Sequence, residues 1–280
     1  MNQLSPAARL RAAIASAERP AVIVGAHNPV SASLIETAGF DGGWISSLEM
    51  SLVHGVEDRN LLGVREVADS IHYMRQAGEL PLVVDADNGY GSVETTRRAV
   101  REFEAAGASA VCLEDSTFPK VNSFRDGDSD LLDVAEHQRR IEAAKSAQRD
   151  PDFLVIARTE AMIRGRGIDE AIRRGQAYVE AGADLILLHS REAGGEQALA
   201  AAAAWQSDVP LVTVPTAFPE LTPAELHRHG FSLVIYANQV LRASVKAIQD
   251  LLQRVRDADR IEEGCVPMGD LFKLASSYAS

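Results

Sequence analysis

Eight short apolar runs, rich in β-branched residues, recur at regular spacing along this chain. They are AVIVGA (21–26), GGWISS (42–47), LVVDAD (82–87), AVCLED (110–115), FLVIAR (153–158), LILLHS (185–190), LVTVPT (211–216) and LVIYAN (233–238). The segments between them have helical periodicity, for example at 94–106, 169–181 and 223–228. Strands that alternate with helices in this way predict a parallel sheet.

A glycine stands shortly before four of these runs, at Gly39, Gly107, Gly182 and Gly230. Such a glycine suits the left-handed residue that ends a helix before a tight connection to the next strand. The runs are continuously apolar, as a sheet covered on both faces requires. Eight strand–helix units in roughly 250 residues is the usual size of a (β/α)8 barrel. We therefore predict an α/β protein with a single (β/α)8, or TIM, barrel domain over residues 1–280, in preference to an open doubly wound sheet.

Charge and cysteine content restrict the class of protein further. The net charge of -12 gives no basic footprint for nucleic acid or an anionic membrane surface, and no apolar stretch is long enough to span a bilayer. With only Cys112 and Cys265, the sequence encodes neither a disulfide framework nor a thiolate zinc site, so we expect a reducing, cytoplasmic setting. The first residues are predicted to form a helix capped by Ser5 with Pro6 at its first position, not a signal peptide.

The C-terminal part of the chain continues beyond the eighth run. Residues 241–255 are predicted to form a further helix, and the tail ending GCVPMGDLFKLASSYAS contains another short amphipathic segment. This segment could pack on the barrel or on a neighbouring subunit. The alanine-rich stretch 198–205 is predicted to be a closely packed barrel helix.

In a barrel of this kind the chemistry lies at the carboxyl ends of the strands. In this chain that edge would carry mostly polar residues: His27, Asn28, Ser46, Ser47, Leu48, Asp85, Asp87, Asn88, Glu114, Asp115, Arg158, Glu160, His189, Ser190, Thr216, Tyr236 and Asn238. Three carboxylates that face one space, those of Asp85, Asp87 and Glu114, are costly unless a cation neutralises them or one is protonated. Carboxylate oxygens favour Mg²⁺ or Mn²⁺ over zinc, so we predict a metal site. Alternatively, some of these carboxylates could cap helices or pair with Arg158.

Arg158 and His189 each allow more than one interpretation. The guanidinium of Arg158 matches a substrate carboxylate or phosphate, but it could equally form a salt bridge with Glu160 or Glu114. His189 could be a ligand, a proton carrier or an anion contact, while a histidine alone at a strand end is more often structural.

The connection after Glu114 is unusually long for a barrel, because roughly twenty residues precede the next helical pattern near Leu132. Its segment SFRDGDSD (123–130) is polar and rich in turn formers, whereas FPK (118–120) places a rigid proline beside a cation. Long loops in compact barrels are commonly lids, so we predict that this loop closes over the site.

Six motifs together resemble one protein family over almost the whole chain. They are VVDADNGYG, LEDSTFPKVNS, ARTEAMIRGRGIDEA, YVEAGADLILLHSR, VPTAFPELT and VIYANQVLRASV. They are similar to the phosphoenolpyruvate mutase and phosphonopyruvate hydrolase branch of the isocitrate lyase superfamily, whose mutases carry EDK, five residues, then NS. The resemblance implies a (β/α)8 barrel, Mg²⁺ with Mn²⁺ as a possible substitute, and tetramers built from dimers that exchange their last helix.

The resemblance also implies how the metal is held. Asp85 would hold it directly, and Asp58, Asp87 and Glu114 would act through its water molecules.

The remaining site residues would contact a small anionic substrate, phosphoenolpyruvate or phosphonopyruvate. The resemblance implies that Arg158 and His189 bind its anionic groups. The backbone around Ser46, Ser47 and Leu48 would receive a carboxylate or enolate oxygen, and Lys120, Asn122 and Ser123 would close over the phosphoryl group. These roles agree with the chemistry, because a migrating phosphoryl group needs a metal, cations and a cover that excludes water.

Three residues depart from the family pattern. Ser116 stands where lysine is usual, Ser47 where glycine is common, and Gln239 where histidine is common. The missing lysine removes one positive charge near the lid. Isocitrate and methylisocitrate lyases use a cysteine of this loop as a proton donor, but none lies between Cys112 and Cys265, so that chemistry is not expected.

The sequence favours a phosphoenolpyruvate mutase, because Asn122 stands where the hydrolases tend to have threonine. The alternative is a phosphonopyruvate hydrolase, toward which VPTAFPELT leans. A 2-oxo acid (oxaloacetate) decarboxylase is a more distant possibility. A binding protein that kept the site after losing activity is a fourth, with Ser116 as its main support.

Overall fold

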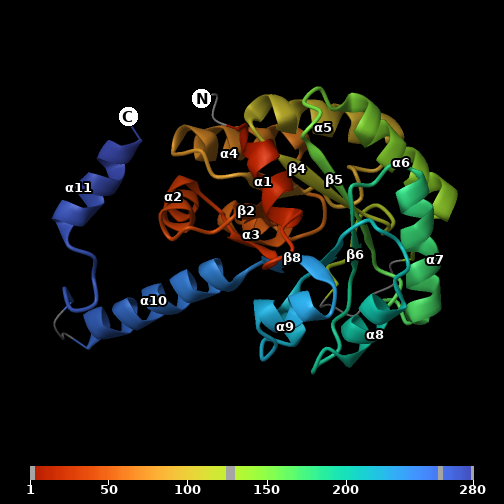
Figure 1. Cartoon of the computed structure of the whole chain (residues 1–280). Helices are drawn as coiled ribbons and strands as arrows, with labels where there is room; N and C mark the ends of the chain where they lie inside the picture. The colour runs from red at the N-terminus through yellow and green to blue at the C-terminus, as the bar shows by residue number, and fades with distance from the viewer. Residues whose placement is uncertain (1–3, 124–129, 258–260, 279–280) are drawn as a thin grey trace.

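The computed structural model describes residues 4–123, 130–257 and 261–278. Eight parallel strands close into a barrel in chain order, with the first strand paired to the last (Figure 1). They are β1 (Ala21–Gly25), β2 (Gly42–Ile45), β3 (Leu82–Asp85), β4 (Ala110–Glu114), β5 (Leu154–Thr159), β6 (Leu185–Leu188), β7 (Leu211–Thr213) and β8 (Phe231–Tyr236). The predicted (β/α)8 barrel is therefore confirmed.

The helices α2 to α9 follow the strands and cover the outside of the barrel (Figure 1). The helical elements are α1 (Pro6–Ile14), α2 (Pro29–Thr37), α3 (Ser47–Val53), α4 (Val64–Gln76), α5 (Val93–Ala106), α6 (Val134–Ala147), α7 (Gly167–Glu180), α8 (Glu196–Ala204), the 3-10 turn η1 (Pro215–Ala217), α9 (Pro223–Arg228), α10 (Gln239–Arg256) and α11 (Met268–Ser277). The predicted cap is present, because the Ser5 hydroxyl accepts the amide of Ala8 at 3.1 Å. The four predicted glycines have φ between 78° and 106°.

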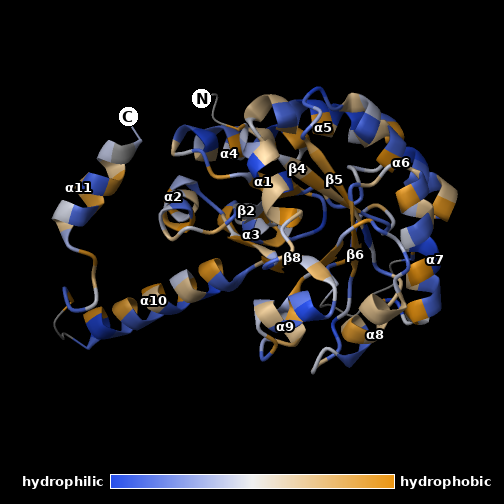
Figure 2. Cartoon of the chain, viewed as in Figure 1, coloured by the Kyte–Doolittle hydropathy of each residue, from blue (hydrophilic) through white to orange (hydrophobic). Residues whose placement is uncertain are grey.

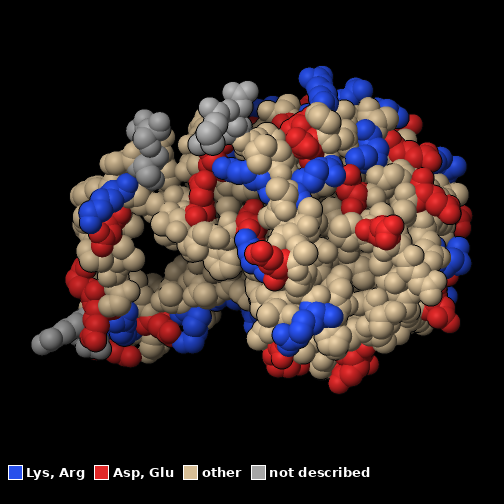
Figure 3. Space-filling model, in the orientation of Figure 1, with Lys and Arg blue, Asp and Glu red and all other residues tan. Residues whose placement is uncertain are grey.

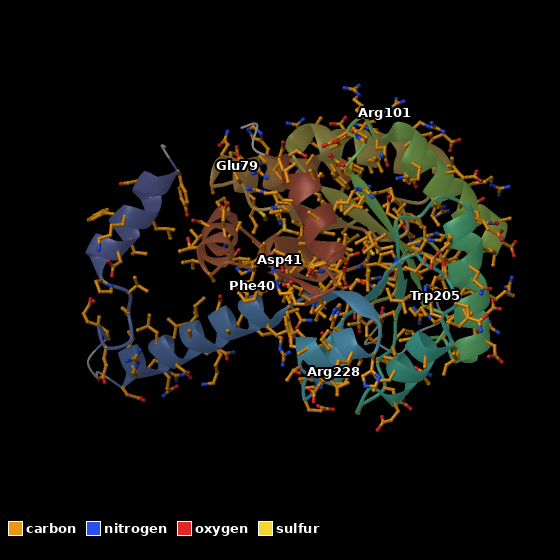
Figure 4. All side chains as sticks on the ribbon, in the orientation of Figure 1. Phe40, Asp41, Glu79, Arg101, Trp205 and Arg228 are labelled. Atoms are coloured by element: carbon orange, nitrogen blue, oxygen red, sulfur yellow. The ribbon has the colours of Figure 1, made fainter. Side chains whose placement is uncertain are left out.

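The alanine-rich helix α8 packs closely, as predicted. Ala198, Ala201 and Ala202 are buried. Just beyond its end, Trp205, labelled in Figure 4, lies against Gly175 of α7. A Cβ at Gly175 would approach the indole to 2.9 Å, so this helix pair depends on the missing side chain.

Two hydrophobic layers share the strands, since side chains alternate between the two faces of a strand. Val83, Cys112, Ile156 and Leu187 point into the barrel with the apolar side chains of α1, whereas their chain neighbours pack under the outer helices. Figure 2 shows the resulting apolar strands at the centre of the molecule. Two residues beyond each inward-facing position, the same alternation reaches the polar strand ends.

The C-terminal helices form an arm outside the barrel. The structure describes all residues of α10, and none of them is buried. Four apolar side chains form one stripe along this helix and are each 45–57% exposed: Val245, Ile248, Leu252 and Val255. The stripe is visible as orange bands in Figure 2, and Figure 3 shows an opening between the arm and the barrel. None of the described helices combines the length and apolarity needed to cross a membrane.

Candidate active site

Strand alternation brings the predicted polar residues to one mouth of the barrel. Asp85, Glu114, Arg158 and His189 stand two positions beyond the inward-facing core residues of their strands. A cavity of about 60 Å³ at this end is lined by Ser46, Ser47, Leu48, Asp58, Asp85, Glu114, Lys120, Asn122, Ser123, Arg158 and His189, among others. Asp87 lies beside it, lining a neighbouring cavity with Asp85. The structure thus brings together the metal and substrate residues that the resemblance implied.

One side of the site is an acidic cluster around an ammonium group. Lys120 Nζ lies 2.7 Å from Asp58 Oδ1, 2.6 Å from Asp87 Oδ1 and 2.6 Å from Ser47 Oγ, and that hydroxyl donates to Asp85 Oδ2 at 2.9 Å. Burial alone would lower the pKa of Lys120, but Asp87 and Asp58 raise it above its ordinary value. Burial raises the pKa of Asp87 to about 6. The protonated lysine is therefore the countercharge of this cluster.

The other side is built around a guanidinium. Arg158 Nε contacts Glu160 and lies 3.4 Å from Glu114 Oε2, while its Nη2 donates to Ser123 Oγ at 2.9 Å. These carboxylates raise the pKa of Arg158 despite its burial, and Arg158 lowers the pKa of Glu160 although burial opposes this. The predicted salt-bridge partners and the predicted site position of Arg158 are thus both found.

His189 is buried against the same pair. Its Nδ1 lies 2.8 Å from Glu160 Oε1 and 3.0 Å from Arg158 Nη2. Burial, and then the charge of Arg158, lower the pKa of His189, so the ring is neutral at neutral pH. A neutral ring that carries its proton on Nδ1 donates to the carboxylate, which fixes the orientation of the imidazole.

Glu114 lies between the two sides. Burial raises its pKa to about 8, because Arg158 offsets the desolvation only in part. The hydroxyl of Ser116, itself fully buried, donates to Glu114 Oε1 at 2.6 Å. At the position where the resemblance expects a lysine, this chain therefore places a neutral donor against the carboxylate.

A short stretch of the long loop after β4 lies directly over the site; we call residues 119–123 the docked segment. Asn122 Nδ2 donates to Asp58 Oδ2 at 2.6 Å, and Ser123 Oγ donates to Glu160 Oε2 at 2.7 Å. Two arginines also donate hydrogen bonds to the backbone of this segment. Arg164 donates to the carbonyl of Val121, and Arg191 donates to the carbonyl of Ser123. The cavity beneath has room for only a few water molecules. Residues 124–129, most of the predicted SFRDGDSD segment, lie outside the described residues.

Asp115 has a structural role at the base of this loop. Its carboxylate is fully buried and accepts from the hydroxyls of Thr159 and Tyr178, from Arg174 and from the amide of Glu160. Its carbonyl accepts the amide of Leu132, near the other end of the loop, at 2.8 Å. Both ends of the loop are thereby fixed to the barrel.

The start of α3 lies at the edge of the site. Ser46 caps this helix, and its hydroxyl accepts the amide of Glu49. The amides of Ser47 and Leu48 belong to the first turn, where a helix provides no partner of its own. Both residues line the cavity, so an anionic oxygen can be received there.

The sequence did not single out several residues that hold the site together, namely Asn60, Arg164 and Arg191. Asn60 lies in the connection between α3 and α4, and it bridges Asp87 and the docked segment. Arg164 and Arg191 stand in the quoted motifs ARTEAMIRGRGIDEA and YVEAGADLILLHSR, which were the available signal for them. Asn60 lies outside the quoted motifs.

Oxygen donors suited to a hard cation are present. Among the described residues no group of three or more His, Cys, Asp or Glu side chains is arranged to hold a metal ion directly. However, the Lys120 ammonium lies 2.7 Å from Asp58 and 2.6 Å from Asp87, and Asp85 is hydrogen bonded to the neighbouring Ser47, so these carboxylates already surround one cation. Such a set fits Mg²⁺ bound through one carboxylate and several waters.

Comparison with known proteins identifies the family. Residues 10–256 match the model of the phosphoenolpyruvate phosphomutase family. The chain is 44% identical to a phosphonopyruvate hydrolase of Variovorax sp. (strain Pal2), over 91% of this chain and 88% of that protein. It is 36% identical to a phosphoenolpyruvate phosphomutase of Tetrahymena pyriformis, over 90% of this chain and 85% of that protein.

Solved structures give the same result. The crystal structure of a phosphoenolpyruvate phosphomutase from Streptomyces platensis subsp. rosaceus superposes with a TM-score of 0.93 at 43% identity, covering 96% of this chain and 95% of that one. A phosphonopyruvate hydrolase in complex with oxalate and Mg²⁺ gives 0.91 at 39%, covering 99% and 96%. The chain therefore belongs to the phosphoenolpyruvate mutase and isocitrate lyase superfamily, in the branch of the phosphoenolpyruvate mutases and phosphonopyruvate hydrolases.

Proposed function

We propose that this protein is a Mg²⁺-dependent phosphoenolpyruvate mutase. The reaction breaks the bond between phosphorus and the enol oxygen and forms a bond between phosphorus and C3 of the resulting enolate. The observation that carries the proposal is the docked segment, in which Asn122 is hydrogen bonded to Asp58 over a cavity of about 60 Å³. A segment docked over the site restricts the access of water to the phosphoryl group during transfer, which a mutase requires.

The metal would be held by Asp85, with Asp58, Asp87 and Glu114 contacting its waters. When bound, Mg²⁺ supplies positive charge to the oxygens of the enolate. The amides of Ser47 and Leu48, with the hydroxyl of Ser46 fixing the helix start, receive a carboxylate oxygen.

The cations and amide of the site would hold the transferring group. Arg158 and His189 bind anionic oxygens from the fixed wall of the barrel, whereas Lys120, Asn122 and Ser123 approach from the docked segment. Lys120 is held among acids in this structure, so it has to leave at least part of that cluster to reach a phosphoryl oxygen. A metal ion would take over the countercharge that the ammonium now provides.

The second candidate function is hydrolysis of phosphonopyruvate to pyruvate and phosphate. It is favoured by the 44% identity to the Variovorax hydrolase. Phosphorus NMR of the purified protein with phosphonopyruvate and Mg²⁺ separates the two. Appearance of phosphoenolpyruvate supports the mutase, and free phosphate alone refutes it in favour of the hydrolase.

We also propose that the α10–α11 arm is exchanged between subunits of a homo-oligomer, expected to be a tetramer. The exposed apolar stripe of α10 needs a partner, and a cavity of about 890 Å³ lined by Leu52, Val53, Leu241 and Val245 opens at the start of that helix. Light scattering after size exclusion should give four times the mass of 30.1 kDa. A monomer would refute this arrangement.

A further inference from the structure

Asn60 connects the acidic cluster to the docked segment through both ends of its side-chain amide. Its Nδ2 donates to Asp87 Oδ2 at 2.8 Å, and its Oδ1 accepts the backbone amide of Lys120 at 2.7 Å. The ammonium of that lysine binds the other oxygen of the carboxylate, Asp87 Oδ1, at 2.6 Å. Asn60, Asp87 and Lys120 thus form a closed ring of hydrogen bonds.

This ring requires an amide at position 60. One end of the side chain has to donate to a carboxylate while the other accepts from a peptide N–H, and a carboxylate at position 60 offers only acceptors. The backbone of Asn60 has φ 56°, in the left-handed region, which asparagine adopts more readily than most residues. Asp87 also lies there, with φ 49°, so contacts from neighbouring elements help to hold its orientation.

We propose that Asn60 is a positioning residue that couples docking of residues 119–123 to the orientation of the Asp87 carboxylate. This inference rests on the proposed function in one respect, since it takes the backbone contact of residues 119–123 with Asn60 to persist in the reacting complex while the Lys120 ammonium moves toward the substrate. When the docked segment leaves, Asp87 loses its contact with the Lys120 ammonium. The Oδ1 atom of Asn60 loses the hydrogen bond from the Lys120 backbone amide, which helps to fix the Asn60 side chain. Closure of the site and preparation of the acidic cluster are then one event.

Two variants separate the two ends of the amide. Asn60→Gly removes both hydrogen bonds and tolerates the left-handed backbone without strain. Asn60→Asp also tolerates this backbone and keeps an acceptor for the Lys120 amide, but it replaces the donor to Asp87 by a like charge. The rate of hydrogen–deuterium exchange in peptides that contain Lys120 measures docking of residues 119–123 in the absence of substrate. Titration with Mg²⁺ plus oxalate measures how tightly the acidic cluster binds the metal. Steady-state kinetics of wild type and variants, with phosphonopyruvate and Mg²⁺, supplies kcat and KM.

We expect Asn60→Gly to speed exchange at the Lys120 amide about tenfold and to lower kcat by a similar factor, since one buried hydrogen bond is lost on each side. In Asn60→Asp we expect protection of that amide to persist while kcat falls and KM changes little. Exchange in Asn60→Gly at the wild-type rate would overturn the proposal. So would an Asn60→Asp variant with wild-type kcat, because the donor to Asp87 would then be dispensable. If phosphorus NMR shows no turnover in wild type, the proposed function fails. The coupling is then still tested by exchange at the Lys120 amide in Asn60→Gly, and by Mg²⁺ plus oxalate titration of Asn60→Asp, where weaker binding than in wild type supports it and unchanged binding refutes it.

Discussion

The two sides of the active site use two cations in different ways. Arg158 extends from β5 and forms ion pairs with Glu160 and Glu114, which come from the barrel itself. Lys120 comes from a loop and forms ion pairs with Asp58 and Asp87. A cation on a strand is placed by the sheet and stays with its partners, whereas a cation on a loop can enter and leave with that loop. The site therefore combines a guanidinium placed by the sheet with an ammonium that a loop brings into an acidic cluster.

The largest effect is expected from removing the carboxylate proposed to hold the metal. Asp85→Ala should reduce Mg²⁺-dependent turnover about 1000-fold or more, because the charge stabilisation that a metal provides is worth several kcal/mol. Circular dichroism should show an unchanged fold. Asp69→Ala, which removes an exposed acid on α4, is the matched control and should keep full activity. Normal turnover in Asp85→Ala would contradict the assignment of the metal to the lysine side of the site.

The unfolding free energy of the metal-free protein should distinguish Arg158, which the sheet places, from Lys120, which a loop carries. Arg158→Met leaves Glu160 buried without its main partner and should cost about 3–5 kcal/mol of unfolding free energy. Lys120→Met should cost only about 1–2 kcal/mol, because the docked segment can leave and admit water to Asp58 and Asp87. Urea unfolding measures both. Equal losses would mean that the two cations are fixed alike.

The docked segment should matter more for turnover than for substrate binding. We expect Asn122→Ala to lower kcat about 100-fold with a smaller change in KM, because a group that closes over the phosphoryl acts mainly on the transition state. Steady-state kinetics provides the test. A rise in KM at unchanged kcat would show instead that Asn122 contributes uniform binding.

Part of the loss of stability at acid pH should come from a residue outside the active site. His137, fully buried in α6 beside Tyr178, has its pKa lowered to about 3 by burial and by Arg140. The unfolded chain binds a proton at this residue below about pH 6.5, whereas the folded protein does not, so stability falls as the pH drops from there toward 3. The loss approaches about 1.4 kcal/mol per pH unit.

Replacing this histidine isolates its contribution. His137→Phe keeps a ring in place and should flatten the decline of the unfolding free energy between pH 6 and pH 4, measured by urea titration at several pH values. His72→Phe, at an exposed position of α4, should leave the decline unchanged. An unchanged slope in His137→Phe would place the acid sensitivity elsewhere, including the site itself.

The predicted and observed elements of the fold agree wherever the prediction rested on short-range sequence patterns. The eight runs, the capped first helix and the four left-handed glycines all follow from short-range rules, and each is found. For the site, the strand-end residues were predictable because the alternation of side chains fixes which positions face inward. Asp115 directly follows Glu114, so the same alternation turns its side chain away from the cavity toward Tyr178, although the strand-end residues of the sequence prediction included it.

By itself, therefore, the sequence determined the barrel, the edge at which its polar residues gather and the chemical types present there. Only the tertiary structure decided that Lys120 enters the acidic cluster and that Asn60 joins the loop to Asp87. The physical reason is the distance along the chain over which each interaction acts. Periodicity and backbone preference act between near neighbours, whereas Lys120 and Asn60 are 60 residues apart, and the folded barrel brings them to hydrogen-bonding distance.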